Sequence, residues 1–322
     1  MAYKRVAVFG ATGLEGESLL QGLSELELGI ESANVFAADA EGETAMFRGR
    51  PVAVKEPSTA DFGVLDLAIF LPEAGSDAGL VDAACDAGIV VLDATDTLAQ
   101  RDDAAIFCEG VAIAGDVKLF AIADAASSQV AALLQQLPTG SIKRVDISLA
   151  QAVSVAGRDG IEALAAETAR LLGGQTPDKT VLGQQIAFNV LPQSADRAAA
   201  EVEHNLSRLL GGDIVIAASV MMVPVFYGHT IMLRVECEDR PNLSALRGSL
   251  SEDSRFRLFP NEDAEQASPV CLQGSDCIDI DQLNYDRRDE TAFRCTVVGD
   301  NLRKGAVFNI IELLKNLIKI NI

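Results

Sequence analysis

A glycine-rich turn near the start of the chain has the composition of a phosphate-binding site. The sequence Gly10-Ala-Thr-Gly13-Leu-Glu-Gly16 follows a β-rich apolar run and opens a helix-like segment, which is the context that a dinucleotide fingerprint requires. Gly10 permits the tight turn, Gly13 lets the backbone approach a pyrophosphate, and the helix N-terminus supplies N–H donors. Thr12 lies within the turn, and Gly16 completes the pattern. This spacing predicts that the chain binds a dinucleotide.

Acidic residues around this turn bear on which dinucleotide would bind. Glu15 and Glu17 fall in the first helical turn, where they favour the helix dipole themselves and partly replace a bound phosphate. Asp39, after the second predicted strand, falls near the position of an acidic residue that holds a ribose hydroxyl. No Lys or Arg adjoins it in the sequence to take a 2′-phosphate. The pattern favours NAD over NADP, with a solvated turn that binds no nucleotide as the alternative.

The elements that would position this turn alternate between strand and helix patterns through the first third of the chain. Helix-like segments are expected at 14–23 and 77–87, and strands at 5–9, 34–38, 65–70, 89–92 and 118–122. Such alternation indicates right-handed βαβ units and a parallel sheet. The last segment, 302–318, is a strong helix former.

The pattern changes after residue 126. Helices are expected at 129–137, 159–172 and 194–210, the last ended by Gly211-Gly212, and strands at 143–150, 214–222, 229–237 and 292–298. Long β-rich runs with few helices predict an open mixed or antiparallel sheet with helices on one face. Residues 250–276 are polar and irregular, and we expect a surface loop there. The fold class is therefore α/β with two domains, as the length of 322 residues also suggests.

Composition excludes several classes of function. The net charge of −21 argues against nucleic acid and anionic membrane surfaces, because phosphate binding needs clustered Lys and Arg. The longest apolar run holds a proline and is too short to span a bilayer, and no signal region precedes the first strand. The six cysteines show no metal-site or disulfide pattern, so we expect reduced thiols in a cytoplasmic protein and no metal.

Three further stretches carry a resemblance to a known family. They are Gln185-Ile-Ala-Phe-Asn-Val-Leu-Pro192, Val223-Pro-Val-Phe-Tyr-Gly-His-Thr230 and Gly299-Asp-Asn-Leu-Arg-Lys-Gly-Ala306. With the glycine-rich turn and Gln151-Ala-Val-Ser154, they resemble the signatures of the aspartate-semialdehyde dehydrogenases, in that family's order and spacing.

The resemblance implies a homodimer of two-domain chains. A Rossmann-type dinucleotide-binding domain would span 1–126 and 303–322, and an α+β dimerisation domain would span 127–302. It also implies the family's chemistry, in which a cysteine thiolate attacks an aldehyde, a nicotinamide exchanges hydride, and phosphate enters or leaves.

Several residues match the family's functional positions. His229 stands where the acid/base would be, and Gln151 matches the glutamine that orients it. Asn301 and Gly305 fall in the block that closes over the nicotinamide side in the family. The alternative for each is a scaffold residue kept for packing or for a turn.

The nucleophile of the family is missing. By direct counting Ser127 takes the place of the cysteine, and residues 109–236 contain no cysteine in any register. A serine could attack only with strong activation, because its hydroxyl is far less ionised than a thiol. The alternative that we favour for Ser127 is a helix N-cap.

The anion-binding residues of the family are depleted as well. Met222 replaces the arginine that would hold the substrate carboxylate, and Arg197 is the only basic residue where a helix would bring a lysine. Arg101 is displaced from the position of the family's arginine. The alternatives for it are a contact with phosphate and an exposed loop residue, of which we favour the second.

The family's nucleophile, its carboxylate-binding arginine and its lysine at the phosphate site are thus all missing. In this combination the chain resembles the Usg-type paralogues of the family, which keep the fold with an altered site. We therefore expect a pseudoenzyme without the classical dehydrogenase activity that retains dinucleotide or small-ligand binding. The alternatives are an active NAD(P)-dependent oxidoreductase with a changed substrate and a structural partner of a true dehydrogenase.

Overall fold

The computed structural model describes residues 3–26, 29–38, 40, 42–72, 78–113, 116–138, 140–178, 181–260, 266–272 and 275–320. The chain forms two compact units, residues 1–124 with 306–322, and residues 125–305. The sequence prediction had these boundaries at 126 and 303.

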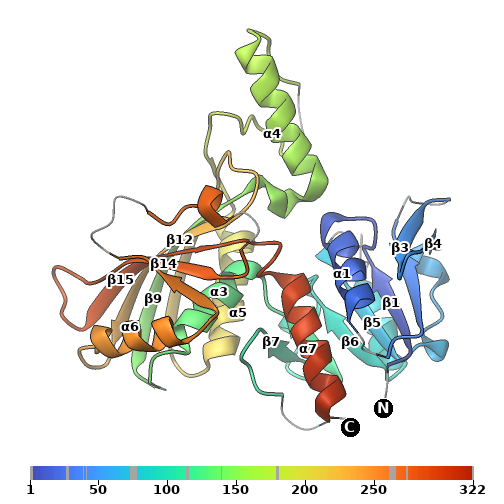
Figure 1. The fold of residues 1–322 in the computed structure, drawn as a ribbon, viewed down its shortest axis with the longest axis horizontal. Coiled ribbons are helices and arrows are strands. Elements are labelled where there is room, and N and C mark those ends of the chain that lie inside the picture. The colour runs from blue at the N-terminus through green and yellow to red at the C-terminus, as the bar shows by residue number, and fades with distance from the viewer. Residues whose placement is uncertain are drawn as a thin grey trace. The chain divides into compact units, whose positions relative to one another are not determined.

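The first unit is built on an eight-stranded sheet (Figure 1). In spatial order the strands are β3 (Thr44–Phe47), β4 (Arg50–Lys55), β2 (Ser32–Phe36), β1 (Arg5–Phe9), β5 (Leu67–Phe70), β6 (Val90–Asp93), β8 (Leu119–Ile122) and β7 (Ala105–Phe107). Neighbouring strands are parallel except in the β3–β4 hairpin. The strand order reverses at β1, and in such sheets ligands bind at the carboxyl ends of the strands on either side of that reversal.

Helices cover both faces of this sheet. Alternate residues of β1 face opposite sides, so Val6 and Val8 join the core under α1 (Leu14–Glu25) and α7 (Ala306–Ile320). Phe9 joins the core under α2 (Ala78–Asp86) and stacks between Phe36 and Phe70, with ring centroids 4.7 and 4.4 Å apart. The expected Rossmann-type α/β unit is confirmed, and the C-terminal helix returns to complete it.

The second unit contains a seven-stranded mixed sheet. In spatial order the strands are β10 (Leu191–Pro192), β11 (Val215–Met222), β9 (Ile142–Gln151), β12 (His229–Cys237), β15 (Ala292–Gly299), β14 (Ile278–Tyr285) and β13 (Phe256–Leu258). The pairs β9–β11 and β13–β14 are parallel, and the others are antiparallel.

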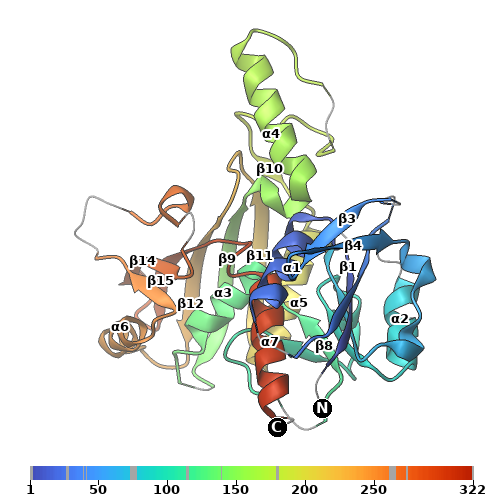
Figure 2. The ribbon, with the colours of Figure 1, turned by 45° about the vertical axis from the view of Figure 1, so that its right-hand side comes forward.

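One face of the mixed sheet packs against helices α3 (Ala125–Leu134), α5 (Ala200–Leu210) and α6 (Leu243–Glu252). Along β12, Ile231 and Leu233 are buried in this layer, while Met232 between them is 52% exposed. Within the described chain the other face of the sheet is therefore uncovered. Helix α4 (Gly157–Leu172) projects beyond one end of the sheet in both views of this unit (Figures 1 and 2).

The helix expected over 194–210 is observed over 195–210, where a π-helical part, Ala195–Ala199, precedes α5. Other local predictions were wrong or incomplete. The expected loop over 250–276 contains β13 and a 3-10 turn, Pro269–Leu272. Strands β3, β4, β7 and β14 and helix α6 were not predicted. None of the helices in the described ranges is both long and apolar enough to cross a membrane.

Candidate functional site

The glycine-rich turn of the first unit joins β1 to α1 and is held against β2. Gly10 adopts a left-handed φ of 82°, which glycine reaches without strain. Its N–H and that of Ala11 donate to the Phe36 carbonyl oxygen at 2.9 and 3.2 Å. The turn closes when the Gly13 N–H donates to the Gly10 carbonyl oxygen at 3.3 Å. The backbone is thereby fixed at the carboxyl end of the central strand.

Helix α1 packs against this turn so closely that only glycine fits at its third residue. A β-carbon added to Gly16 would lie 2.2 Å from the Gly10 carbonyl oxygen. Gly13 is the N-cap of α1 and has no side chain to cap the helix amides. Thr12, in the turn, is half-buried. These features fit the cradle of a dinucleotide pyrophosphate.

Acidic residues lie near this turn, and the fold adds a basic residue that the sequence does not reveal. Glu15 and Glu17 lie in the first turn of α1. Asp39 lies outside the described residues. Lys55 pairs with Phe36 at the carboxyl end of β2, and its Nζ donates to Asn34 Oδ1 at 3.3 Å. The hairpin therefore brings a cation beside the strand that precedes Asp39, although Lys55 follows Phe36 by 19 positions in the chain.

His229 occupies a buried position in the second unit. It is the first residue of β12, is 2% exposed and pairs with Gly299 of β15. The pairing of Thr230 with Ala150 places His229 beside Gln151 at the end of β9. The structure therefore brings together the two residues expected to act as acid/base and orienting group.

Asn301 forms hydrogen bonds with two other signature stretches, those that contain Gly228 and Ser154. Its Oδ1 accepts from the Gly228 N–H at 2.8 Å, and its Nδ2 donates to Ser154 Oγ at 3.0 Å. Asn301 is 5% exposed, so both bonds are shielded from water. Gly305 packs equally tightly, because an added β-carbon would lie 2.0 Å from the Asn301 carbonyl oxygen. Both residues belong to the second unit and have clear scaffold roles within it.

Ser127 is not the helix N-cap that we favoured from the sequence. Helix α3 begins two residues earlier, at Ala125, so Ser127 lies inside its first turn. The residue is 0% exposed. The prediction was wrong because the small residues at 125 and 126 allow the helix to start earlier.

Gln129 is a residue of this region that sequence reasoning missed. It is fully buried on α3, and its Nε2 lies 3.5 Å from the Asp300 carbonyl oxygen. Its side chain packs on Gly299, where an added β-carbon would come within 2.4 Å of it. Gln129 therefore fills the space beside the strand partner of His229. A long polar residue in an otherwise small and apolar helix was the available signal.

Two thiols of the second unit are unsuited to nucleophilic attack. Burial raises the pKa of Cys295 to about 12, so its thiol stays protonated at neutral pH. Burial also raises the pKa of Cys237. This residue ends β12, whereas His229 begins it, so the two lie roughly 26 Å apart at about 3.3 Å per residue.

Cys271 is an exposed thiol of this unit. It lies on the 3-10 turn Pro269–Leu272, and Pro269 of this turn is a neighbour of Gly228. An added β-carbon at Gly228 would lie 3.0 Å from Pro269 Cβ, two residues before Cys271. The Ser268 hydroxyl contacts the Cys271 Sγ at 3.2 Å. Cys271 falls far in the sequence from the position of the family's cysteine, so no sequence signal placed it near Gly228.

Met222, Arg101 and Arg197 stand at or near the positions where the family binds anions. Met222 is 6% exposed in an apolar cluster with Val153, Leu164 and Ile186. Arg101, in the first unit, is held by Asp82 at 3.0 Å and by Asp103 at 2.8 Å. Arg197 is exposed on the π-helical turn. The described residues contain no cluster that could hold a metal ion.

Comparisons with known proteins cover both units. Residues 5–114 match the model "Semialdehyde dehydrogenase, NAD binding domain", and residues 130–304 match "Semialdehyde dehydrogenase, dimerisation domain". Aspartate-semialdehyde dehydrogenase 2 of Vibrio cholerae is 28% identical over 98% of this chain and 97% of its own. A USG-1 protein homolog of Azotobacter vinelandii is 25% identical over 98% and 97%.

Solved structures agree with this match. Aspartate semialdehyde dehydrogenase II from Vibrio cholerae, complexed with ASA, superposes with a TM-score of 0.87 at 27% identity, covering 99% of each chain. An aspartate semialdehyde dehydrogenase with NADP from Candida albicans has a TM-score of 0.72 at 18% identity, covering 97% of this chain and 98% of its own, which is a likeness of fold alone.

Proposed function

Because this chain belongs to the semialdehyde dehydrogenase family, we propose that it is a paralogue that binds a dinucleotide but lacks the thiol- and phosphate-dependent oxidation of an aldehyde. The chain is about as similar to a named dehydrogenase, at 28% identity, as to a USG-1 homolog, at 25%. Overall similarity therefore does not separate the two kinds of relative. The Usg-type assignment rests on the residues of the site.

The observation that carries the proposal is the state of Ser127. It stands in the place of the family's cysteine, lies within α3 and is 0% exposed. A serine hydroxyl is a weak nucleophile until a base activates it, and it must also be accessible to the substrate. The ester that it would form is also less reactive than a thioester.

The loss of the arginine supports the same proposal. An arginine at 222 would offer a carboxylate two charge-assisted hydrogen bonds, and a methionine offers none. Met222 is buried among apolar residues, and a carboxylate placed against them would lose its hydration without compensation.

Dinucleotide binding is supported by the turn between β1 and α1. Gly16 allows the close approach of α1, and Gly13 leaves the helix amides uncapped by its own side chain. We propose NAD as the cofactor, with Asp39 as the ribose ligand. The nicotinamide of a bound dinucleotide would supply the hydride acceptor, so the missing component is the protein nucleophile.

Further properties belong to the same proposal. The six cysteines are free thiols, which supports a cytoplasmic location. The match to a dimerisation domain supports a homodimer.

Covalent trapping tests the proposal. The protein is incubated with aspartate semialdehyde and NAD or NADP without phosphate, so that an acyl-enzyme would accumulate, and its intact mass is measured. We expect no acyl adduct. An adduct that maps to Ser127 or Cys271 and disappears in Ser127→Ala or Cys271→Ser would overturn the proposal.

A second candidate function is an oxidoreductase that uses His229 on a substrate without a carboxylate. The position of His229 beside Gln151, next to the Thr230–Ala150 pair, favours it, and the apolar surroundings of Met222 suit an uncharged substrate group. Turnover of neutral aldehydes with NAD that is lost in His229→Ala would support this function. Its absence over a panel of aliphatic and aromatic aldehydes would exclude it.

A further inference from the structure

A reversal of the chain between β13 and β14 brings two cysteines of the second unit to one place. The Ser275 N–H donates to the Leu272 carbonyl oxygen at 2.7 Å. Residues joined in this way are the ends of a turn and lie within about 7 Å of each other. Cys271 directly precedes Leu272, and Cys277 follows Ser275 by two positions. Both cysteines therefore lie at the base of the same turn.

The pairing of β13 with β14 places a guanidinium group beside the two thiols. Arg257 pairs with Asp279, and its Nε donates to Asp279 Oδ1 at 2.8 Å. Cys277 directly precedes β14, and its thiol donates to the Ser254 carbonyl oxygen, just before β13, at 3.8 Å. Asp279 raises the pKa of Arg257 most, and the charges of Cys277 and Cys271 raise it further. The guanidinium is therefore within electrostatic reach of both sulfur atoms.

The two thiols differ in their exposure to solvent. Cys271 is exposed, and its Sγ accepts a hydrogen bond from the Ser268 hydroxyl at 3.2 Å. Cys277 is half-buried, whereas Cys237 and Cys295 of the same unit are buried. An accessible sulfur with a positive charge nearby and a second thiol within reach is typical of redox-active cysteines. A dissolved oxidant therefore meets Cys271 first.

We propose that Cys271 and Cys277 are a redox-sensitive pair that forms a reversible disulfide when hydrogen peroxide oxidises Cys271. The Cys271 sulfur attacks one peroxide oxygen, the O–O bond breaks, and a sulfenic acid and one water form. The Cys277 sulfur then displaces the hydroxyl group of the sulfenic acid, so the S–S bond forms and a second water leaves. The two thiols lose two electrons in all, which the peroxide gains. A disulfide needs Cα atoms about 4.4–6.8 Å apart, which suits residues at the base of one turn.

The disulfide restrains a segment that packs against the turn before His229. An added β-carbon at Gly228 would lie 3.0 Å from Pro269 Cβ, on the 3-10 turn that carries the exposed thiol. Asp276, between the two cysteines, accepts a hydrogen bond from Arg303 Nε at 2.9 Å. The segment thus contacts two of the signature stretches, and a cross-link at its base limits how far it moves away from them.

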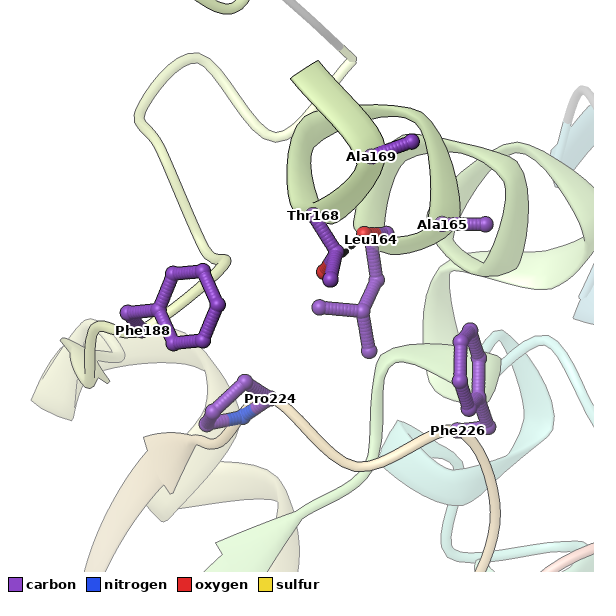
Figure 3. A pocket seen from close by; sticks show the side chains of 7 residues that line it. All are labelled: Leu164, Ala165, Thr168, Ala169, Phe188, Pro224 and Phe226. Carbon is purple, nitrogen blue, oxygen red and sulfur yellow. Dashed lines mark hydrogen bonds between the residues drawn. The ribbon is translucent and has the colours of Figure 1, made fainter. Parts of the chain in front are cut away.

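The stretch that the segment contacts also forms one wall of an apolar groove. Phe226, two residues before Gly228, lines this groove of about 470 Å³ together with Pro224 (Figure 3). The Phe226 carbonyl oxygen accepts from the Ser154 N–H at 3.2 Å, and the Gly228 N–H donates to Asn301 Oδ1 at 2.8 Å. Because this backbone is held on both sides, a restraint at Gly228 acts on His229 and on the groove wall together.

Mass spectrometry of the full chain after treatment with hydrogen peroxide tests the proposal. The remaining thiols are alkylated under denaturing conditions, and the peptides are mapped. We expect the number of alkylated thiols to fall by two from six, with Cys271 and Cys277 joined, and to recover after treatment with a dithiol. Cys271→Ser and Cys277→Ser should each lose the cross-link, and in Cys277→Ser a dione that labels sulfenic acids should mark Cys271. The matched control, Cys85→Ser, removes a half-buried thiol of the first unit and should leave the cross-link intact.

Hydrogen exchange measures whether the cross-link acts on the turn before His229. Oxidation should slow the exchange of the Gly228 amide in the wild type and leave it unchanged in Cys277→Ser. A sulfinic acid at Cys271 without a cross-link, a disulfide between two copies, or a bond to another cysteine would overturn the proposal. Equal exchange before and after oxidation of the wild type would refute the action on the turn. Because neither substrate nor nucleotide is used, an active enzyme would refute the proposed function and leave this result standing.

Discussion

At the scale of single residues, side-chain placement rather than residue type decides the chemistry. Ser127 has a hydroxyl but lies fully buried inside a helix. His229 and Gln151 meet at neighbouring strand ends, as their family positions imply. Lys55 is brought to the end of β2 by a hairpin, and no reading of adjacent residues could place it there. The proposed NAD preference is therefore best tested at the two residues with opposite charge.

Calorimetry with NAD and NADP tests the cofactor proposal. We expect NAD to bind more tightly than NADP and Asp39→Ala to weaken NAD about tenfold, because a ribose hydroxyl loses its charged acceptor. Lys55→Ala should leave NAD unchanged. Tighter binding of NADP, with the advantage lost in Lys55→Ala, would show that the cation sets the preference. No heat with either nucleotide would refute binding altogether.

At the scale of elements, the second unit depends on contacts that fix strand ends and helix starts. Asn301 joins the turn before β12 to the turn after β9, and Glu167 joins α4 to the loop before β10. These contacts give the signature stretches a structural role in a chain that has no cysteine at residues 109–236. The stretches support the architecture as well as the family's chemistry.

Replacing Asn301 should destabilise the protein. Asn301→Ala removes the acceptor of the buried Gly228 N–H and the partner of Ser154, and each buried group left unpaired costs about 1–3 kcal/mol. Chemical denaturation should show a clear loss in the free energy of unfolding. Ser154→Ala, which removes one of these bonds and keeps the other, should cost less. Equal stability of Asn301→Ala and wild type would contradict the scaffold role.

Two helical glycines should respond in opposite directions to the same change. Gly16→Ala would force a β-carbon to 2.2 Å from the Gly10 carbonyl oxygen, so we expect a loss of about 1–3 kcal/mol in unfolding free energy. Gly248→Ala on α6 meets nothing within 4 Å, and helix propensity should stabilise it by up to about 1 kcal/mol. Thermal unfolding of both variants gives the comparison. A Gly16→Ala variant as stable as wild type would show that α1 can move away from the turn.

At the scale of the whole molecule, the sequence was sufficient for the architecture and not for the site. Alternating patterns predicted the parallel sheet because its central strands are continuous apolar runs, such as Val6 to Phe9, which are 0% exposed. Strand β14 escaped prediction because Asp279 and Asp281 interrupt its apolar pattern, and the structure satisfies Asp279 with Arg257. Buried polar residues of this kind, including Gln129, depend on partners far away in the chain, so no local pattern reveals them.

Steady-state turnover tests whether any group of this protein replaces the family's thiol. Reduction of NAD and NADP by aspartate semialdehyde is followed with phosphate, in the wild type and in the Ser127→Ala and Cys271→Ser variants. We expect a rate at the level of the enzyme-free reaction for all three proteins. Phosphate-dependent turnover in the ordinary enzyme range, about 1–10³ s⁻¹, that is lost in either variant would contradict it.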